Sequence, residues 1–466
     1  MVIVFVSKLS IKNYRLFDSQ KEYTFDNFNI HDTQNEGSGL TVLVGENGCG
    51  KTTILDAISS CILDYKAESF NISDIENPKE KTEIKVFSSE EFNVAGTFPN
   101  NDFKANGFYF KGSVRARGNK SYLLTPIVYD QLFLKVDPDK PKDGSPDLRL
   151  SVNNPFSGKR FNDTDILYLD KNRLFQTRSG TYNTTRFDRI MSDFNFQYIK
   201  NSDNIEDLNK DLNEKIKRDK IENKFLEDAI NEFERISGYR PQLEFLDNYN
   251  PFKNATFMIK KESNQQINLS NLGSGYEMLF SLIYSYYMSI QNNKNLIVLI
   301  DEPELHLHPS LQGKFVEFLL NISKSAQIII TTHSSLLIKQ LSYNELVKTI
   351  ILNNDKNFSP MADRKLSYIS SNETNYLAFN LTSEEYHNEL YEELFYKYAT
   401  SSKIKDFDNQ FFITTKGEAK QYPWMKYPNE VSIHTFVRNQ IHHQADNGKA
   451  SISDLKTSIK TMRTYL

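Results

Sequence analysis

One stretch of the sequence, LTVLVGENGCGKTTILDAI, constrains the fold more than any other. The apolar run at residues 40–44 is typical of a strand buried on both faces of a parallel sheet, and a helical pattern follows it. Between them lies a match to G-x-x-x-x-G-K-[ST], in which backbone N–H groups surround phosphate oxygens at the N-terminus of a helix. The stretch therefore predicts a phosphate-binding loop (P-loop) in an α/β fold.

The loop assigns a role to several side chains. Lys51 would reach the β- and γ-phosphates of ATP, and the Thr52 hydroxyl would bind Mg²⁺. Cys49 is expected only to be a small residue within the loop. The cofactor-binding residues predicted here are Gly45, Asn47, Gly48, Gly50, Lys51, Thr52 and Thr53.

A P-loop ATPase also needs a carboxylate for the metal ion and a group that activates water. NLIVLIDEPELHLHP supplies both, because the buried-strand pattern at 296–300 delivers Asp301 for Mg²⁺ and Glu302 for the attacking water. A further strand pattern, 327–331, leads to His333, which could bind the γ-phosphate or that water. A histidine of this kind is more often a satisfied loop residue, but the Asp-Glu strand before it favours a catalytic role.

Composition limits the remaining possibilities. The 466 residues exceed one ordinary core and predict two or three domains. The net charge of −4 argues against coating nucleic acid by bulk charge, so any nucleic-acid contact would be local. Two cysteines without metal or disulfide spacing indicate a reducing cytosol, and no signal peptide or membrane span is visible. We expect a cytoplasmic protein that does not contact membranes.

The segments GENGCGKTT, DEPELHLHP and TTHS, in this order, resemble the ABC-type ATPase heads of SMC-like repair proteins and of bacterial anti-phage defence ATPases, including the OLD and Septu PtuA-like groups. The resemblance covers roughly residues 1–345. It extends to LSIKNYRLF, because such heads place an Asn-aromatic-Arg strand against the nucleotide. This makes Arg15 a candidate contact, with a solvated strand-end charge as the alternative.

The resemblance also implies a homodimer or higher homo-oligomer in which two heads sandwich ATP, each using a signature Ser-Gly loop on the nucleotide of the other. The candidate here is Ser274-Gly275, before a helix with Met278, Leu279, Leu282 and Ile283 at helical spacing. The family's Leu-Ser-Gly-Gly pattern is not intact, since Tyr276 replaces a glycine or polar residue. The nearby LSNL is a competing register.

An insertion at about 65–265 separates the P-loop from the signature segment. Its short β-like runs and later charged helical stretch predict a β-rich arm and a helical lobe, and the absence of sustained heptads weakens the reading as an SMC-like DNA repair clamp. The stretch DFKANGFYFKGSVRARGNKSY interleaves basic and aromatic residues, which fits either a nucleic-acid contact or a charged sheet edge. The predicted fold is thus an ABC-type P-loop head plus a C-terminal, mostly helical domain.

That C-terminal domain is expected at 346–466, and residues 403–466 hold ten Lys and Arg against six Asp and Glu. A capping box, Thr382 with Glu385, predicts the start of one of its helices. Near its end, Arg438 and His443 match the R-N-x-x-x-H motif of HEPN ribonucleases, and four to five residues along a helix are expected to share one side. The alternative is a polar face on which a partner docks.

The leading hypothesis is an ATPase that regulates a separately encoded effector in anti-phage defence, with an HNH nuclease as the candidate effector. The alternatives are a self-contained, ATP-switched HEPN-like ribonuclease toxin that uses Arg438 and His443, and the repair clamp.

Overall fold

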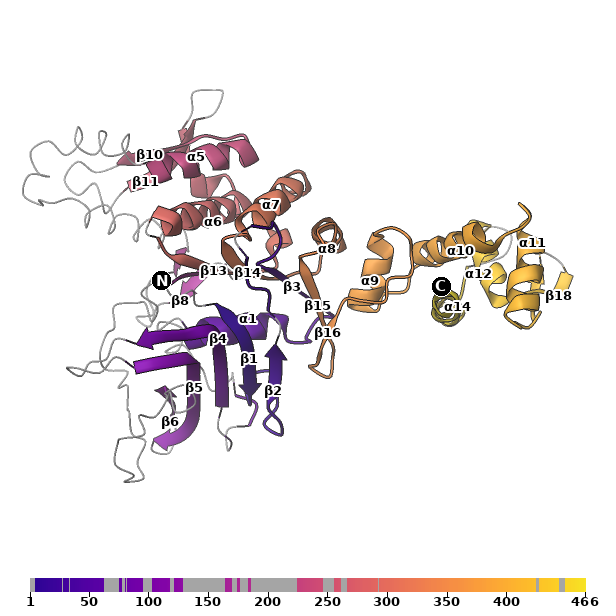
Figure 1. Cartoon of the computed structure of the whole chain (residues 1–466), viewed down its shortest axis with the longest axis horizontal. Coiled ribbons are helices and arrows are strands. Elements are labelled where there is room, and N and C mark those ends of the chain that lie inside the picture. The colour runs from indigo at the N-terminus through magenta and orange to yellow at the C-terminus, as the bar shows by residue number, and fades with distance from the viewer. Residues whose placement is uncertain are drawn as a thin grey trace, which may run out of the picture. The chain divides into compact units, whose positions relative to one another are not determined.

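The computed structural model of the chain divides into two compact units (Figure 1). It describes residues 5–26, 28–32, 34–62, 75–77, 80, 82–94, 103–117, 121–128, 164–169, 174–176, 183–185, 224–245, 255–260, 266–291, 293–424, 427–443 and 449–466. The first unit, the head, comprises Met1–His333 and Asn344–Ser359, and the second, the C-terminal unit, comprises Ser334–Tyr343 and Pro360–Leu466. A single boundary at residue 345 does not describe this division, because the chain leaves the head, returns to it and leaves again.

The centre of the head is a six-stranded sheet with the order β16-β15-β3-β14-β13-β7. Strands β3, β7, β13, β14 and β15 pair in parallel, and every residue of β3 and β14 is buried, as the continuous apolar runs predict. The strands are β3 (Leu40–Val44), β7 (Thr164–Leu169), β13 (Asn295–Asp301), β14 (Ala326–Thr331), β15 (Lys348–Leu352) and β16 (Phe358–Pro360). Because β3, β14 and β13 are neighbours, the segments that follow them meet at one edge of the sheet.

A second, antiparallel sheet forms the β-rich arm, with the order β2-β1-β4-β5-β6. Its strands are β1 (Val6–Lys12), β2 (Tyr23–Asp26), β4 (Thr82–Val94), β5 (Phe103–Arg117) and β6 (Ser121–Val128), and a separate hairpin pairs β8 (Leu174–Gln176) with β9 (Asn183–Thr185). The predicted arm is therefore present. The basic side chains of the stretch that forms β5 lie outside the described part of the structure, so a nucleic-acid contact there stays a prediction.

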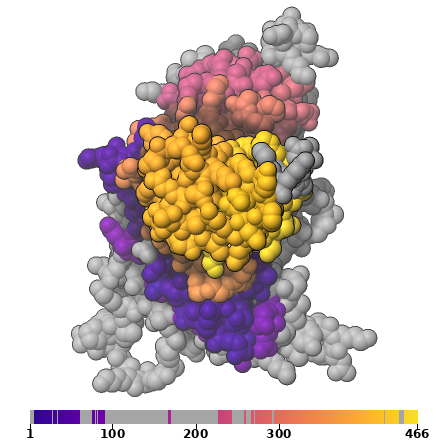
Figure 2. Space-filling view, turned by 90° about the vertical axis from the view of Figure 1, so that its right-hand side faces the viewer, coloured from indigo at the N-terminus to yellow at the C-terminus, as the bar shows by residue number. Residues whose placement is uncertain are grey.

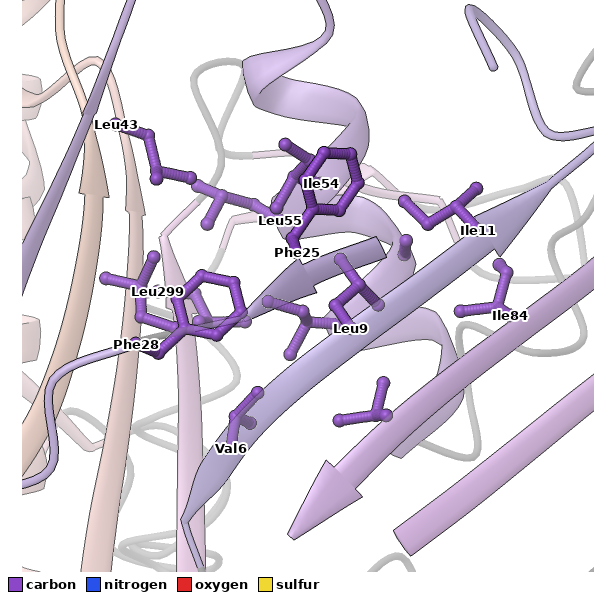
Figure 3. Packing of buried hydrophobic residues seen from close by; sticks show 14 of the residues in the cluster. Val6, Leu9, Ile11, Phe25, Phe28, Leu43, Ile54, Leu55, Ile84 and Leu299 are labelled. Carbon is purple, nitrogen blue, oxygen red and sulfur yellow. The ribbon is translucent and has the colours of Figure 1, made fainter. Parts of the chain in front are cut away.

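The helix that follows the P-loop, α1 (Lys51–Ile62), contacts β4 of the arm and β13 of the parallel sheet. Figure 3 shows the apolar side chains of both sheets directed toward it, with Leu9 near Leu55 and with Ile84 beside Ile11. These residues are fully buried, and each buried Leu or Ile contributes about 1.5–3 kcal/mol. This core fixes the direction of α1 and with it the position of the P-loop.

The helical lobe carries the signature segment. Its elements are α5 (Lys224–Ser237), β10 (Pro241–Phe245), β11 (Ala255–Lys260), β12 (Gln266–Asn268), the 3₁₀ turn Leu269–Asn271, α6 (Ser274–Gln291) and α7 (Pro309–Ile322), which follows a 3₁₀ turn at Pro303–Leu305. The apolar positions predicted for α6 are all buried, and Phe280 packs edge-on against Phe233 and Phe257. The part of the charged stretch that precedes α5 lies outside the described residues.

The C-terminal unit is mostly helical, as predicted, and Figure 2 shows its surface in orange to yellow. Its elements are α8 (Ser335–Ser342), α9 (Ser371–Phe379), α10 (Glu384–Tyr398), α11 (Ile404–Phe407), the π-helix Asp408–Thr415, β17 (Tyr422–Trp424), β18 (Tyr427–Val431), α12 (Ile433–His442) and α14 (Ile452–Tyr465). An aromatic-rich core of its own includes Tyr391, Phe412 and Met462. Throughout the described chain, no helix combines the length and apolar character needed to cross a membrane.

Candidate functional site

The P-loop joins β3 to α1 through three glycines in left-handed backbone conformations. Gly45, Gly48 and Gly50 have φ of 145°, 76° and 114°. A Cβ on Gly45 would lie 2.4 Å from the Leu352 carbonyl oxygen, so no other residue fits there. Asn47 and Gly48 are exposed at the tip of the loop. The geometry is that of a backbone cradle open toward an anion at the start of α1.

Lys51 is folded back onto this loop. Its ammonium donates hydrogen bonds to the Gly45 and Glu46 carbonyl oxygens, at 2.9 and 3.0 Å, and lies 3.6 Å from the Cys49 Sγ. Burial lowers the pKa of Lys51, because the charged form has lost solvation. A cation in this state is well suited to phosphate oxygens. Thr53, by contrast, is buried beneath the loop.

Asp301 at the end of β13 faces Thr52 at the start of α1. The Thr52 hydroxyl lies 3.0 Å from both carboxylate oxygens of Asp301, and the Thr331 hydroxyl donates to the same carboxylate at 2.5 Å. Burial, with a smaller contribution from the neighbouring carboxylates of Glu302 and Asp56, raises the pKa of Asp301 to about 6, although the hydrogen bonds from Thr331 and Thr52 act in the opposite direction. A hydroxyl and a carboxylate so placed are the oxygen ligands that Mg²⁺ prefers.

Glu302 and His333 come together as predicted. The Glu302 carboxylate lies 3.6 Å from the His333 Nε2, and its backbone has φ 47°, a left-handed turn that ends β13. The Glu302 N–H donates to the Thr331 carbonyl oxygen at 3.1 Å, which fixes that turn against β14. A carboxylate beside a histidine at the phosphate-binding edge of the sheet can orient and polarise water.

Glu304 supports this pair and was not identified from the sequence. Its buried carboxylate accepts hydrogen bonds from the Thr332 hydroxyl at 2.8 Å and from the His333 backbone N–H at 2.6 Å, and burial raises its pKa. The segment that carries His333 is thus tied to the turn after β13. The only sequence signal was a second glutamate in DEPE.

The turn between β15 and β16 also contacts the P-loop. The Lys356 ammonium donates to the Gly48 carbonyl oxygen at 3.0 Å, and the Asn354 amide donates to the Glu46 carboxylate at 3.0 Å. No motif in NNDKN indicated this contact, since it depends on β15 returning to pair with β3.

Arg15 is paired rather than solvated. Its guanidinium donates to Asp56 of α1, which also accepts a hydrogen bond from the Tyr168 hydroxyl at 2.8 Å. It lies 5.2 Å from the Tyr14 ring centroid and keeps about a third of its side chain exposed. The solvated strand-end alternative does not describe this residue, and its contact with nucleotide stays a prediction.

Ser274 is the first residue of α6, whereas the competing LSNL register falls largely in the preceding 3₁₀ turn. The Ser274 hydroxyl is exposed and lies 2.9 Å from the His306 Nδ1. A Cβ on Gly275 would lie 2.0 Å from the His306 carbonyl oxygen. Gly275 therefore allows the start of α6 to lie close to the turn after Glu302 within the same subunit.

Arg438 and His443, the pair predicted near the C-terminus, do not line one pocket. Arg438 lines a pocket of the C-terminal unit with His442, while His443 is exposed at the C-terminal cap of α12 and does not line that pocket. The expectation that Arg438 and His443 share one side of a helix was wrong, because α12 ends at His442 and His443 has non-helical backbone angles, φ −130° and ψ 51°.

Comparisons with known proteins identify the family of the chain and several relatives. The model of the family described as "AAA ATPase domain" matches residues 5–106 and 170–338. The Retron Vc95 probable ATPase of Vibrio cholerae serotype O1 biovar El Tor is 24% identical over 405 residues, which cover 74% of each chain. The Septu protein PtuA of Bacillus thuringiensis is 33% identical over 117 residues, 22% of this chain and 30% of PtuA.

Among solved structures, the SMC head bound to the C-terminal winged-helix domain of ScpA is similar at 17% identity with a TM-score of 0.40. The match covers 74% of this chain and 93% of the SMC head.

Proposed function

Because the chain belongs to the AAA ATPase domain family, we propose that it uses ATP binding and hydrolysis to control a separate effector protein in bacterial defence against phage. The chain is an ATPase, related to the retron ATPase and to Septu PtuA. The observation that carries the proposal is the meeting of the P-loop, the Asp301–Glu302 turn and His333 at one edge of the parallel sheet.

ATP would bind with its phosphates in the P-loop cradle. The backbone N–H groups of the loop and the N-terminus of α1 would surround the phosphate oxygens. The Lys51 ammonium would then donate its hydrogen bonds to phosphate oxygens instead of to the Gly45 and Glu46 carbonyl oxygens. Since Lys51 is buried, its attraction to phosphate is screened less than in water. Lys356 would hold the tip of the loop at Gly48.

Mg²⁺ would be held by the Thr52 hydroxyl and the Asp301 carboxylate, and when bound it would neutralise part of the phosphate charge. The residues fit this role because their oxygens already face one another at 3.0 Å. The raised pKa of Asp301 also supports Mg²⁺ binding, because a nearby cation stabilises the charged form of a buried carboxylate.

Hydrolysis would depend on Glu302 as the base that orients the attacking water. His333, 3.6 Å away, would hydrogen-bond the water or the γ-phosphate, and Glu304 would keep His333 in place through its backbone N–H. The left-handed turn at Glu302 positions its carboxylate beside His333 rather than along β13.

Two heads would pair around ATP in a homodimer or a larger homo-oligomer. Each would present Ser274 and the N-terminus of α6 to the nucleotide of the other, where the helix dipole favours anions. The exposure of Ser274 supports this arrangement. Arg15, a third exposed, could then contact the nucleotide from its own strand.

The effector would be a separately encoded nuclease, with an HNH nuclease as the candidate, acting with this chain in the cytoplasm. The test is co-expression of the chain with the products of its neighbouring genes, as wild type, Lys51→Ala and Glu302→Gln. We expect one nuclease to copurify and its activity to differ between the ATP-free Lys51→Ala form and the ATP-locked Glu302→Gln form. Control by this ATPase would be refuted if no nuclease copurified. It would also be refuted if a copurified nuclease had equal activity with the wild type, Lys51→Ala and Glu302→Gln.

A further inference from the structure

The turn that follows Glu302 also touches the signature segment of the same chain. It is a single 3₁₀ turn, Pro303–Leu305, which Glu302 precedes and His306 ends. The Leu305 N–H donates to the Glu302 carbonyl oxygen at 3.2 Å. The His306 N–H donates to the Pro303 carbonyl oxygen at 3.3 Å. These two backbone hydrogen bonds fix the position of His306 relative to Glu302.

His306 contacts the start of α6 through both its side chain and its backbone. The His306 Nδ1 lies 2.9 Å from the Ser274 Oγ. A Cβ on Gly275 would lie 2.0 Å from the His306 carbonyl oxygen, so glycine is needed for the two segments to approach this closely. His306 is half-buried, whereas Ser274 is exposed. The serine is therefore accessible to a group from outside the chain while the imidazole holds its hydroxyl.

The direction of the hydrogen bond between Ser274 and His306 decides where the serine hydrogen goes. A hydroxyl has one hydrogen to donate, and a neutral imidazole has one N–H and one acceptor nitrogen. If Ser274 donates to the His306 Nδ1, its hydrogen is used within the chain. If the Nδ1–H donates to the Ser274 Oγ, the serine hydrogen is available to a phosphate oxygen. The hydroxyl is then also a stronger donor, because hydrogen bonds in a chain polarise one another.

We propose that His306 is a positioning residue for ATP hydrolysis: its Nδ1–H donates to the Ser274 Oγ and directs the serine hydrogen to the γ-phosphate of the ATP held by the partner head. This role depends on the proposed pairing of two heads around ATP. Charge shifts among the phosphate oxygens during the transfer. A donor held in place therefore lowers the barrier more than it strengthens ATP binding.

A second histidine–serine pair in the same segment has a local function. The His308 Nδ1 lies 2.8 Å from the Ser310 Oγ, and the His308 side chain accepts the Ser310 backbone N–H at the start of α7. This pair caps a helix. Ser274 and His306, by contrast, are 32 residues apart in the sequence, so their contact depends on the fold. The capping pair provides a matched control.

The first experiment is steady-state turnover by the full chain at saturating ATP. His306→Phe, which keeps a ring but removes its nitrogens, should lower turnover by about tenfold or more. His306→Asn should retain most of the turnover, because its amide can donate to the Ser274 Oγ in place of the Nδ1–H. Affinity for fluorescently labelled ATP should change by less than about threefold in both variants. The control His308→Asn keeps a good capping residue and should match the wild type.

His306→Gln keeps the role testable if His306→Phe fails to fold. Its longer side chain carries the amide in place of Nε2 rather than Nδ1, so the amide does not reach the Ser274 Oγ in the same way. Turnover by His306→Gln should therefore fall well below that of His306→Asn. Equal turnover by these two variants, or an equal loss in His308→Asn, would overturn the role of His306.

A double-mutant cycle separates positioning from a structural role. Ser274→Ala should lower turnover at least as much as His306→Phe does. The double variant, Ser274→Ala with His306→Phe, should be no slower than Ser274→Ala alone, because His306 acts through the serine. Losses that add in the double variant would show that His306 acts elsewhere, which would overturn the proposal.

Complementation tests whether His306 acts on the ATP of the partner head. His306→Phe and Lys51→Ala chains, co-expressed and purified through two different tags, would form a mixed dimer. One ATP in that dimer has both an intact Lys51 and an intact His306. Turnover above the sum of the two separate variants would support the proposal. No gain over that sum would place the effect of His306 in its own ATP site and overturn the proposal.

Glu302→Gln, measured in the same series, distinguishes failure of this proposal from failure of the proposed function. Loss of turnover in Glu302→Gln with wild-type turnover in His306→Phe would overturn the role of His306 alone. Undiminished turnover in Glu302→Gln would overturn the proposed hydrolysis site, and the role of His306 with it.

Discussion

At the scale of single residues, the sequence predicted the groups whose role depends on a local pattern. The P-loop, Asp301 and Glu302 are recognisable because strand, turn and helix follow one another within a few residues. Glu304 and Lys356 were missed because they act on distant segments through tertiary contacts. Arg438 shares a pocket with His442 rather than with the predicted His443, because α12 ends at His442.

Gly275 gives a residue-scale prediction. Gly275→Ala should lower both the melting temperature and ATP turnover, because the new Cβ would meet the His306 carbonyl oxygen at 2.0 Å and displace the N-terminus of α6. Gly313→Ala is the matched control, since a Cβ there in α7 meets nothing within 4 Å. That substitution should raise the stability by up to about 1 kcal/mol. Equal effects of the two variants in a thermal melt would show that the close approach is unimportant.

At the scale of elements, continuous apolar runs predicted the buried strands β3, β13 and β14, because a parallel strand covered on both faces has no polar side. The capping box was misplaced by one residue. Ser383, not Thr382, caps α10, and its hydroxyl oxygen accepts the Tyr386 N–H at 3.0 Å. Two adjacent hydroxyl residues offer equivalent local chemistry, so packing of the helix decides which one caps it.

The last helix, α14, is held by a buried ionic network. Arg463 donates to Glu373 at 3.4 Å, to Asp363 at 2.9 Å and to the Tyr386 hydroxyl, and Glu373 is fully buried. Arg463→Ala should destabilise the C-terminal unit by about 3–5 kcal/mol, because it leaves a buried carboxylate without its cation.

Chemical denaturation followed by circular dichroism measures this effect. Lys460→Ala, an exposed position on the same helix, should change the stability by less than about 0.5 kcal/mol. A loss of under 1 kcal/mol for Arg463→Ala would mean that α14 is held by its apolar face alone.

At the scale of the whole molecule, the sequence predicted a head and a helical C-terminal unit but not how the chain is shared between them. The segment 344–359 returns to the head because β15 completes the parallel sheet beside β3, while 334–343 belongs to the C-terminal unit. The alternation of strand and helix patterns along the sequence does not reveal which sheet β15 joins. A boundary drawn at residue 345 from the sequence therefore places residues 346–359 in the wrong unit.

The C-terminal unit should lose stability in acid. In the C-terminal unit, burial lowers the pKa of His387 to about 3, and its Nε2 lies 2.8 Å from the Ser458 Oγ. The folded state keeps this histidine neutral. Its contribution to the free energy of unfolding is therefore complete above the unfolded pKa of 6.5 and is lost as the pH falls from 6.5 toward 3. The loss should be about 1.4 kcal/mol per pH unit.

Thermal melts of wild type and His387→Asn at pH 7.5 and pH 5 measure this dependence. His387→Asn should have a lower melting temperature than the wild type at pH 7.5. Its melting temperature should fall less than that of the wild type between pH 7.5 and pH 5. An equal pH dependence in both proteins would exclude His387 as the source.

The central claim is that Glu302 drives hydrolysis in the head, and steady-state ATP turnover of Glu302→Gln beside the exposed control Glu345→Gln tests it most directly. We expect Glu302→Gln to bind ATP with near wild-type affinity and to turn over at least about 100-fold more slowly, while Glu345→Gln matches the wild type. If two heads pair around ATP as proposed, Glu302→Gln should also accumulate as the ATP-bound dimer on a sizing column. Undiminished turnover by Glu302→Gln would contradict the account.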